Sequence, residues 1–321
     1  MPCSVHFKTL RREDLPELNN RHTLYTFDPR SILDECLGKH RYIVSCENLL
    51  SQILLNQHIA VNQYAFKLPF PERNELFVVP ITGDPRPSLY RRMKDLVFPD
   101  EIEHLYACVP HPEADELAES LNLHLNCNHD DFLRYNDKIA QKTALGDLTP
   151  VWEIIDPRVH TYDDSEDCYY KRANGAGGYA TFHNTDRKGM KMPSRKYPAL
   201  WYKESTVEGE PCSVQIYRSS ESEYRVFGYS EMRIVERKTY AGGRMRRIDA
   251  LNQEIQIQIQ EALSRLDSLF TGYHGFMGLD FIAFDNKIQL LEANVRVTMA
   301  TFATLELNAS DQQELSFYRF K

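Results

Sequence analysis

The sequence contains no long apolar run, and this absence narrows the class of protein that it can encode. No segment of the 321 residues approaches the roughly 20 apolar residues that a membrane-spanning helix needs, and the N-terminal segment lacks an apolar core of signal-peptide length. Lysine and arginine form no block and the net charge is -8, which disfavours a nucleic-acid or anionic-membrane partner. We therefore expect a cytoplasmic protein that binds small molecules or other proteins.

Cysteine occurs without the spacing that a disulfide framework requires. The seven cysteines contain no CxxC pair, and an odd number without regular spacing is typical of a reducing compartment. Three familiar signatures are also absent, because the sequence has no GxxxxGK[ST] loop, no GxGxxG turn and no GxSxG elbow. A Walker loop, a Rossmann phosphate site and a serine-hydrolase triad are therefore not expected.

The chain is long enough for two or three lobes. Between residues 40 and 127, short apolar strands predicted at 42–45, 76–81 and 104–109 alternate with helical stretches such as 112–121, which indicates an α/β lobe with a parallel sheet. A second lobe begins near residue 130, with strands predicted at 168–171 and 200–202. A helix is predicted over 249–270, where apolar spacing favours a helix over strand alternation. Residues 1–39 have too weak a pattern to be placed.

The most informative segment is a predicted hairpin with strands at 279–284 and 288–293 and a turn at 285–287. If the turn is centred on Asn286, Asp280 lies directly opposite Glu292, at a cross-strand spacing of about 5 Å where like charges repel. Asn294 falls on the same face because side chains alternate along a strand. Three oxygen-bearing side chains of this kind suit a hard divalent cation such as Mg²⁺ that also binds phosphate oxygens.

Apolar residues surround these carboxylates, which favours burial over the alternative of an exposed hairpin whose acids point to water. Alternation predicts that Ile282, Phe284, Ile288 and Leu290 lie on one side of the hairpin and Leu279, Phe281 and Leu291 on the other. Buried carboxylates need positive charge nearby.

A glycine-rich loop follows the predicted strand that ends in Lys171. Gly175, Gly177 and Gly178 would let backbone N–H groups turn toward an anion, and the lysine adds a positive charge. A flexible hairpin loop is the alternative. Lys138 lies at the start of a helix predicted over 139–145, and by itself it is typical of a solvated surface lysine.

A strand that breaks and then resumes is a second candidate binding element. The strand at 200–202 leads into an acidic loop with Glu204, Glu208 and Glu210, and a strand resumes at 213–217. The backbone groups of such an interruption can pair with the edge of an adenine, and the glutamates can accept from ribose hydroxyls; a hairpin with a charged tip is the alternative. Arg296, on the face of Asn294, can neutralise a transferred phosphoryl or acyl oxygen, or form a structural salt bridge.

Taken in this order, these residues resemble the ATP-grasp superfamily over roughly residues 130–304, and the hairpin from Gly278 to Arg296 carries most of the resemblance. The resemblance implies an α/β (α+β) fold, in which an ATP-grasp fold is preceded by a Rossmann-like domain. It implies a pre-ATP-grasp domain at 1–129, a small subdomain with the glycine-rich flap at 130–203 and a C-terminal subdomain with the metal site at 204–321.

The resemblance also implies roles for single residues, with ATP and Mg²⁺ or Mn²⁺ as the cofactors. Lys138 and Lys171 are similar to the two phosphate-binding lysines of the family, and the flap that closes over the triphosphate is represented by Gly175, Gly177 and Gly178. The adenine-binding hinge is represented by Glu204, Ser205 and Val207, and the metal ligands by Asp280, Glu292 and Asn294. Arg296 resembles the arginine beside the reacting phosphate, so Lys171 and Arg296 are the expected catalytic residues.

Two positions depart from the family pattern. The ribose-binding acid usually follows the hinge glycine by one or two residues, where this chain has Glu210 and Pro211, so Glu210 is the first choice and Glu208 the alternative. The family often has an arginine just before the first metal carboxylate, where this chain has none at 277–279. The oxyanion role therefore falls more heavily on Arg296.

The resemblance implies an ATP-dependent ligase that forms a C–N bond through an acyl phosphate and releases ADP. The expected partners are a small carboxylate and an amine, such as amino acids or a peptide, and a homodimer is an open alternative for the assembly. Arg244 and Arg246 are candidates for binding a substrate carboxylate, because arginine can donate two N–H groups to it; a solvated basic loop is the alternative. Two other functions stay open, namely modification of a protein or peptide acceptor and nucleotide binding without turnover.

Overall fold

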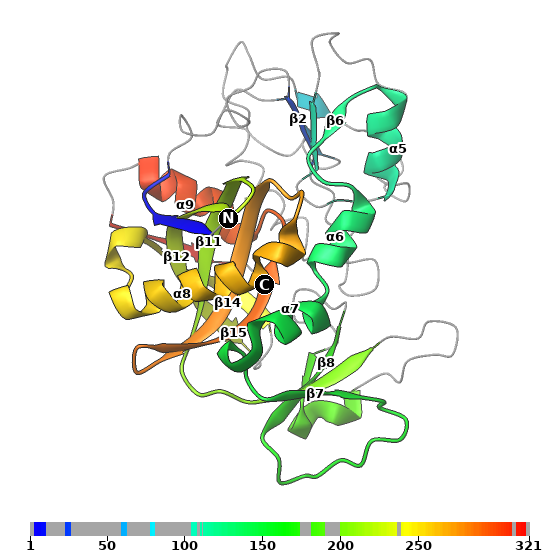
Figure 1. Ribbon diagram of the computed structural model, residues 1–321, viewed down its shortest axis with the longest axis vertical. Helices are drawn as coiled ribbons and strands as arrows, with labels where there is room; N and C mark the ends of the chain where they lie inside the picture. Colours follow the sequence, from blue (N-terminus) through cyan, green and yellow to red (C-terminus); the bar gives the residue numbers. More distant parts are fainter. Residues whose placement is uncertain are drawn as a thin grey trace.

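The structure is a mixed α/β protein in which helices and two further sheets surround one large, mainly antiparallel sheet (Figure 1). The computed structural model describes residues 3–10, 23–26, 59–62, 78–80, 104–107, 110, 112–173, 181–189, 200–235, 239–309 and 313–318. The strand predicted at 42–45 and the loop that contains Gly175, Gly177 and Gly178 lie outside these residues.

The large sheet forms the centre of the described structure. Its strands follow the order β15 (Lys287–Asn294), β14 (Gly275–Phe284), β11 (Glu210–Ser220), β12 (Glu223–Val235), β13 (Thr239–Arg247) and β16 (Glu314–Tyr318). Neighbours along this order are antiparallel. β1 (Ser4–Phe7) pairs in parallel with the first part of β12, beside the part that pairs with β13. The first described strand of the chain thus lies in the same sheet as the predicted metal hairpin.

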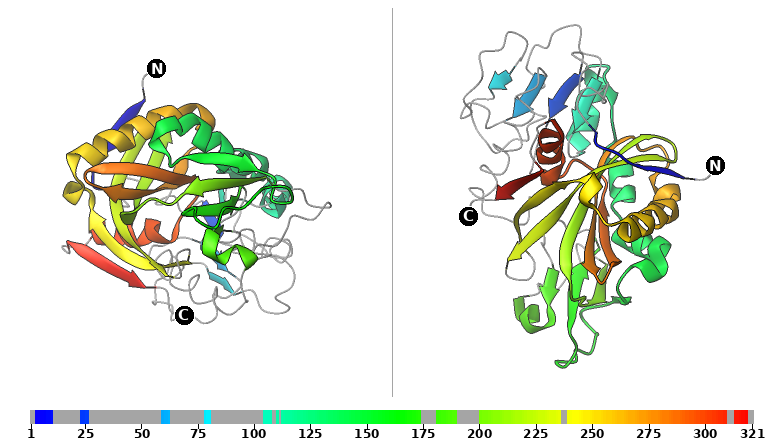
Figure 2. Two further views of the ribbon diagram at one scale, coloured as in Figure 1. Left: turned by 90° about the horizontal axis from the view of Figure 1, so that it is seen from below. Right: turned by 90° about the vertical axis from the view of Figure 1, so that its left-hand side faces the viewer.

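A helix covers each face of the large sheet, as the right-hand view of Figure 2 shows. α8 (Gln253–Leu266) lies on one face, flanked by 3₁₀ turns at Ile248–Ala250 and Asp267–Phe270, and the helix predicted over 249–270 is confirmed. The main core fills the space between α8 and the sheet, with Ile259 and Leu263 packed among residues such as Val214, Leu279 and Leu290. α9 (Met299–Ala309) packs on the opposite face.

The β14–β15 hairpin pairs Asp280 directly with Glu292, as predicted. The route to this register differs from the expected one. The turn consists of two residues, Asp285 and Asn286, whose φ values of 46° and 62° are typical of a tight hairpin turn. Such a turn alone would place Leu291 opposite Asp280. The register shifts by one residue between Asp280 and Phe281, so a β-bulge restores the Asp280–Glu292 pair.

The bulge also corrects the predicted faces of the hairpin. Ile288 and Leu290 pair with Ala283 and Phe281, and both lie in the core beneath α8. Strict alternation placed them instead on the side of Asp280, because it could not detect the extra residue. One side of β15 therefore faces the core near the turn, while Glu292 faces the opposite side of the sheet beyond the bulge.

α7 (Lys138–Leu145) lies against β15, the edge strand of the large sheet. The helix begins at Asp137, whose carboxylate accepts from two backbone N–H groups of the first turn. The buried Gln141 side chain donates to Ala293 O and accepts from Ala293 N, both at 2.8 Å, as a neighbouring strand would. Asn136 accepts from Val295 N at 3.0 Å. These bonds fix the start of α7 beside the end of β15.

A smaller antiparallel sheet lies below the large one in Figure 1. Its strands follow the order β7 (Trp152–Ile155), β10 (Trp201–Ser205), β8 (Cys168–Arg172) and β9 (Thr181–His183). The strands predicted at 168–171 and 200–202 correspond to β8 and β10, and 3₁₀ turns at Gly146–Leu148 and Asn184–Gly189 adjoin the sheet. α7 connects to this sheet through β7 and so joins it to the large one.

The N-terminal part of the chain contains a parallel sheet, as predicted. Its described strands follow the order β4 (Val78–Pro80), β3 (Ile59–Asn62), β2 (Thr23–Thr26), β5 (His104–Ala107) and β6 (His124–Leu125), and all their pairings are parallel. The helix predicted at 112–121 is α5 (Pro112–Ser120), and α6 (His129–Tyr135) leads from this sheet to α7. A Rossmann-like arrangement of this part stays a prediction. None of the helices in the described residues is long and apolar enough to cross a membrane.

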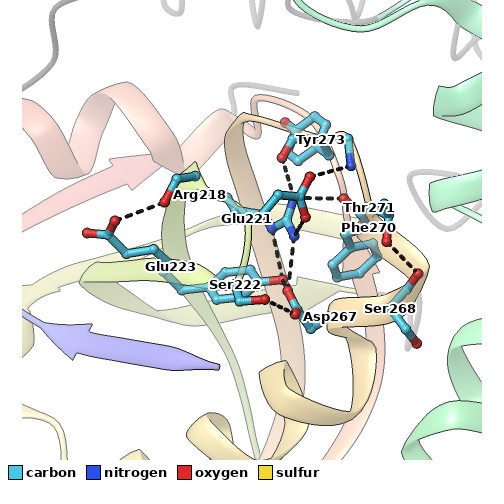
Figure 3. Close-up of polar contacts among 12 residues, drawn as sticks. Arg218, Glu221, Ser222, Glu223, Asp267, Ser268, Phe270, Thr271 and Tyr273 are labelled. Carbon is cyan, nitrogen blue, oxygen red and sulfur yellow. Dashed lines mark hydrogen bonds and ion pairs between the residues drawn. The ribbon is translucent and has the colours of Figure 1, made fainter. Parts of the chain in front are cut away.

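A fully buried arginine fixes the segment between α8 and β14. Figure 3 shows the guanidinium of Arg218, on β11, donating to the carbonyl oxygens of Phe270 and Tyr273 and to the carboxylate of Asp267 at 3.0 Å. Its side chain is 0% exposed. The hydroxyl of Tyr224 also donates to Asp267, at 2.6 Å. Burial alone would raise the pKa of Asp267, but these hydrogen bonds and the charge of Arg218 hold it below its usual value.

We expect Arg218→Met to lower the free energy of unfolding by about 3–5 kcal/mol, because it removes the positive charge paired with Asp267 and leaves two buried carbonyl groups without their donor. Glu221→Gln is the matched control. Glu221 also bonds to Arg218, but its side chain is 54% exposed, and its loss should cost less than about 1 kcal/mol. Chemical denaturation measures both. Equal losses in the two variants would contradict this account.

Candidate active site

Asp280, Glu292 and Asn294 lie together at the centre of the site. Asn294 donates from Nδ2 to Asp280 Oδ2 at 2.9 Å, and the same nitrogen lies 3.4 Å from Glu292 Oε1. The sheet register explains this grouping, because Asp280 pairs with Glu292 and Gly278 pairs with Asn294 on one face. The structure therefore brings together the three side chains that the sequence predicted as metal ligands. Their role as ligands stays a prediction.

The two carboxylates differ in charge because their surroundings differ. Burial and then repulsion from Glu292 raise the pKa of Asp280 to about 7. Burial acts on Glu292 in the same direction, but the positive charges of Lys138, Lys171 and Arg296 outweigh it and hold its pKa below the usual value. The protein thus neutralises one carboxylate well and the other poorly.

A divalent cation fits this donor set. Two carboxylates are hard oxygen ligands, and the carbonyl oxygen of Asn294 would join them once its amide turns, because the amide nitrogen faces the carboxylates in the structure. This number of ligands leaves positions for phosphate oxygens, as is usual for Mg²⁺. A bound cation would also supply the positive charge that Asp280 lacks. Across the part of the chain that the structure describes, no cluster combines three or more His, Cys, Asp or Glu side chains in a metal-binding arrangement.

Lys138 contacts one of these carboxylates, and Arg296 contacts the neighbouring Asn294. The ammonium of Lys138, at the start of α7, forms an ion pair with Glu292 Oε2. Arg296 donates to Asn294 Oδ1 at 2.9 Å and to Val297 O at 3.1 Å. Both side chains lie where the sequence predicted them, beside the hairpin carboxylates.

A third carboxylate, that of Glu204, contacts two lysines. Lys171 on β8 contacts Glu204 Oε1, and Lys142 on α7 contacts Glu204 Oε2. The side chain of Glu204 is 2% exposed and that of Lys142 is 1% exposed. Lys142 was not predicted as a site residue, although its spacing of four from Lys138 puts both on one face of α7 and was a usable signal.

The segment after β10 has the irregular backbone predicted for a hinge. The N–H of Ser205 donates to Val151 O at 2.9 Å, and the N–H of Thr206 donates to Asp167 O at 3.0 Å. Gly209 has a φ of 145°, and a Cβ on it would lie 2.4 Å from Ala283 O. Only glycine fits this position, because the segment passes so close to the backbone of β14 that a side chain would collide with it. Val207 is partly buried between these points.

An apolar surface on the small sheet faces the same side as Lys171. Tyr202 pairs with Lys171 and with Ile154, so the three side chains share a face. Ile154 is 53% exposed, and Trp152 packs edge-on against Tyr202 with ring centroids 6.3 Å apart. An exposed aliphatic side chain on the same face as Lys171, with Tyr202 between them, suits the flat face of a base. The sequence offered no signal for it, because only the strand pairing places Ile154 there.

The strand register places Glu210, the expected ribose contact, on the face of the sheet opposite to Asp280. Glu210 pairs with Ala283, and alternation puts it on the side of Cys212, facing the α8 core rather than Asp280. Glu231, which pairs with Cys212 on the neighbouring strand, lies on the same face. Pro211 takes the position on the site face. Glu208, the alternative choice, precedes Gly209 and is exposed.

The register also separates Arg244 and Arg246 from the site. Arg246 lies in the cross-strand row of Tyr229, Val214 and Leu279, which pack in the core under α8. Both arginines contact Glu231, Arg246 through Nε at 2.8 Å and Arg244 more loosely at 3.9 Å. They therefore lie on the face opposite to Asp280, and we do not carry their substrate role further. The alternation of β13 could not be related to β14 without the pairing of the strands between them.

Comparison with known proteins bears on this arrangement. A family model for the ATP-grasp domain matches residues 135–300, which is more than half of the 321-residue chain. The chain belongs to the ATP-grasp family. The matched range runs from α6 to the start of α9 and includes Lys138, Lys171, Asp280 and Arg296. A search of curated proteins gives no match.

Solved structures share the ATP-grasp fold at low sequence identity. An L-amino acid ligase from Bacillus licheniformis aligns with a TM-score of 0.54 and 15% identity, over 88% of this chain and 68% of that one. A biotin carboxylase from Campylobacter jejuni gives 0.56 and 10%, over 90% and 68%. A D-alanine–D-alanine ligase from Bacillus anthracis, in complex with ATP, gives 0.50 and 13%, over 89% and 90%. At these identities the likeness shows the fold alone.

The raised pKa of Asp280 predicts how the metal-free ATP-grasp domain responds to Asp280→Asn. An acid with a higher pKa in the folded state destabilises the fold as pH rises from its unfolded pKa, about 4, upward. For Asp280 this effect is complete above its folded pKa of about 7. In the presence of EDTA, we therefore expect the variant to melt at a higher temperature than the wild type at pH 8, with a smaller difference toward pH 4.

Asp285→Asn is the control for that measurement, because Asp285 is an exposed residue in the turn of the same hairpin. It should leave the pH dependence of the melting temperature unchanged. A wild type that is more stable than Asp280→Asn at pH 8 without metal would overturn the assignment of a strained carboxylate pair.

Proposed function

We propose that this ATP-grasp protein is an ATP- and Mg²⁺-dependent ligase that joins a carboxylate to an amine through an acyl phosphate, with release of ADP and phosphate. The observation that carries the proposal is the Asp280–Glu292 pair, which lies beside Asn294 and is approached by Lys138 and Arg296. Such a site concentrates hard oxygen ligands and positive charge at one point, which is what the phosphates of a nucleotide require.

The nucleotide lies between the small sheet and the hairpin in this proposal. Lys138 and Lys171 bind its phosphates, and the loop with Gly175, Gly177 and Gly178 closes over them. The adenine contacts the hinge from Glu204 through Ser205 to Val207 by way of backbone groups, because the Glu204 carboxylate is occupied by two lysines. Ile154, which is exposed on this face of the small sheet, provides apolar surface beside it.

Asp280, Glu292 and Asn294 would hold Mg²⁺, since the donor set fits the ion. When bound, the ion supplies positive charge that offsets the negative charge on the phosphate oxygens and helps to orient them. Arg296, which donates to Asn294, lies next to this point and stabilises charge that develops on the transferred group.

The reaction proceeds in two displacements. A carboxylate oxygen of the first substrate attacks the γ-phosphorus of ATP; the new O–P bond forms as the bond to the bridging oxygen breaks, and ADP leaves. The amine nitrogen of the second substrate then attacks the carbonyl carbon of the acyl phosphate. The C–N bond forms, the C–O bond to phosphate breaks, and the amine loses a proton to solvent. Lys171 and Arg296 contribute by charge and positioning rather than as bases.

Amino acids are the proposed substrate class. Two of the structural neighbours are named as an L-amino acid ligase and a D-alanine–D-alanine ligase, which supports amino acids as the carboxylate and the amine. Amino acids also offer both reacting groups in small molecules.

The direct test is ADP release by the wild type with Mg²⁺, ATP and pairs of amino acids, with the product identified by mass spectrometry. We expect at least one pair to stimulate ADP release and to yield a dipeptide mass. Asp280→Asn and Glu292→Gln should each lower the rate by about 100-fold or more, since each removes a charged ligand of the Mg²⁺ that would orient the reacting phosphates. ATP binding without stimulated ADP release by any pair would contradict the ligase proposal.

A matched pair of variants tests the ribose contact. We propose Glu208 for this role, because Glu210 lies on the other face of β11. Glu208→Gln should weaken ATP binding by about tenfold, as expected for one charge-assisted hydrogen bond, while Glu210→Gln should have little effect. Titration with a fluorescent ATP analogue measures both affinities. If Glu210→Gln weakened ATP binding more than Glu208→Gln, the ribose contact would be assigned to Glu210 instead.

A further inference from the structure

Glu204 has two lysine partners, although one positive charge would neutralise it. Its two carboxylate oxygens contact Lys142 and Lys171 separately. All three side chains come from different elements, α7, β8 and β10. The carboxylate lies in the interior, where an unpaired charge is strongly unfavourable. A second lysine therefore calls for a reason beyond neutralisation.

The two lysines are held to different degrees. Lys142 is 1% exposed, donates to Thr149 Oγ1 at 2.8 Å and lies 5.5 Å from the centre of the Tyr202 ring. Lys171 is 15% exposed and lies near the end of β8. Lys142 is thus enclosed by α7, β10 and the segment before β7, whereas Lys171 borders the site.

The two ammonium groups also oppose each other. Burial lowers the pKa of Lys142 to about 8; Glu204 acts against this, while Lys171 and Lys138 lower it further. Removal of Lys171 from Glu204 would relieve that repulsion. It would still leave the buried carboxylate with Lys142.

We propose that Lys142 is a positioning residue that keeps Glu204 neutralised, so that Lys171 can leave Glu204 and bind a phosphate of ATP. Without Lys142, Lys171 would be the sole counter-charge of a buried carboxylate, and its transfer to a phosphate would strand that charge. This inference rests on the proposed function, since it takes Lys171 as a phosphate-binding residue.

Lys142→Met tests the inference, because Met keeps the length of the side chain and removes its charge. The Kd for ATP in the presence of Mg²⁺, measured by calorimetry, should rise by about tenfold or more. Adding Glu204→Gln to Lys142→Met removes the charge that holds Lys171, so the double variant should regain most of the lost affinity. A merely structural role for Lys142 predicts no such recovery.

Lys203→Met is the matched control. Lys203 is the neighbour of Glu204 on β10, points to the opposite face of that strand and forms ion pairs with Glu153 and Glu166. It should leave the Kd unchanged. Melting curves confirm that each variant is folded.

A measurement on the wild type keeps the test independent of whether Lys142→Met folds. Above pH 8 Lys142 loses its proton, and Lys171 becomes the lysine that neutralises Glu204. ATP affinity should therefore fall as pH rises through this range in the wild type. It should not fall in this way in Glu204→Gln. The charged neighbours that face Lys142 are Glu204, Lys171 and Lys138, and the comparison with Glu204→Gln isolates the first.

The outcomes separate the two proposals. A wild type that binds no ATP would refute the proposed function itself. A wild type that binds ATP, together with an unaltered Kd in Lys142→Met or no recovery in the double variant, would overturn the role of Lys142 and leave the proposed function intact. The same pH profile in the wild type and Glu204→Gln would also overturn it.

Discussion

The candidate site depends on one constraint, the cross-strand pairing of Asp280 with Glu292. The two-residue turn at Asp285–Asn286 and the bulge beyond it fix the register of β14 and β15, so the carboxylates cannot move apart without unpairing the hairpin. Packing of the hairpin under α8 prevents that. Two like charges held together and partly buried raise the pKa of Asp280 to about 7, and positive charge is required around them. The remaining features of the site supply it.

The positive charges are positioned by backbone interactions rather than by the carboxylates alone. Gln141 binds α7 to the edge of β15, and this contact brings Lys138 to Glu292 and Lys142 to Glu204. Glu292 therefore contacts Lys138 and Glu204 contacts Lys171, and these are the two lysines that we propose to bind phosphates of ATP. Glu292 and Glu204 are thus neutralised by the protein itself, and in our proposal Lys171 exchanges Glu204 for a phosphate when the nucleotide binds.

The sequence predicted the parts of the fold that depend on local pattern. The α8 helix, the antiparallel hairpin and the parallel N-terminal sheet follow from apolar periodicity. The Asp280–Glu292 pair was predicted from a turn centred on Asn286, whereas the structure forms it through a two-residue turn and a bulge. It could not reveal the bulge, which moved Leu290 to the core, nor the long-range pairing that turns Glu210 and Arg246 away from the site. Alternation defines faces within one strand, and only the pairing of distant strands relates those faces to each other. Lys142 was missed for a different reason: its spacing of four from Lys138 puts both lysines on one face of α7, but only the folded chain brings Lys142 to Glu204.

The central claim is that the hairpin carboxylates bind ATP together with a divalent cation. Calorimetric titration of ATP into the wild type and into the double variant Asp280→Asn/Glu292→Gln, each with and without Mg²⁺, tests it most directly. The account predicts that Mg²⁺ strengthens ATP binding to the wild type and has no such effect on the double variant. Equal ATP affinity of the two proteins in the presence of Mg²⁺, or no binding by the wild type under either condition, would contradict it.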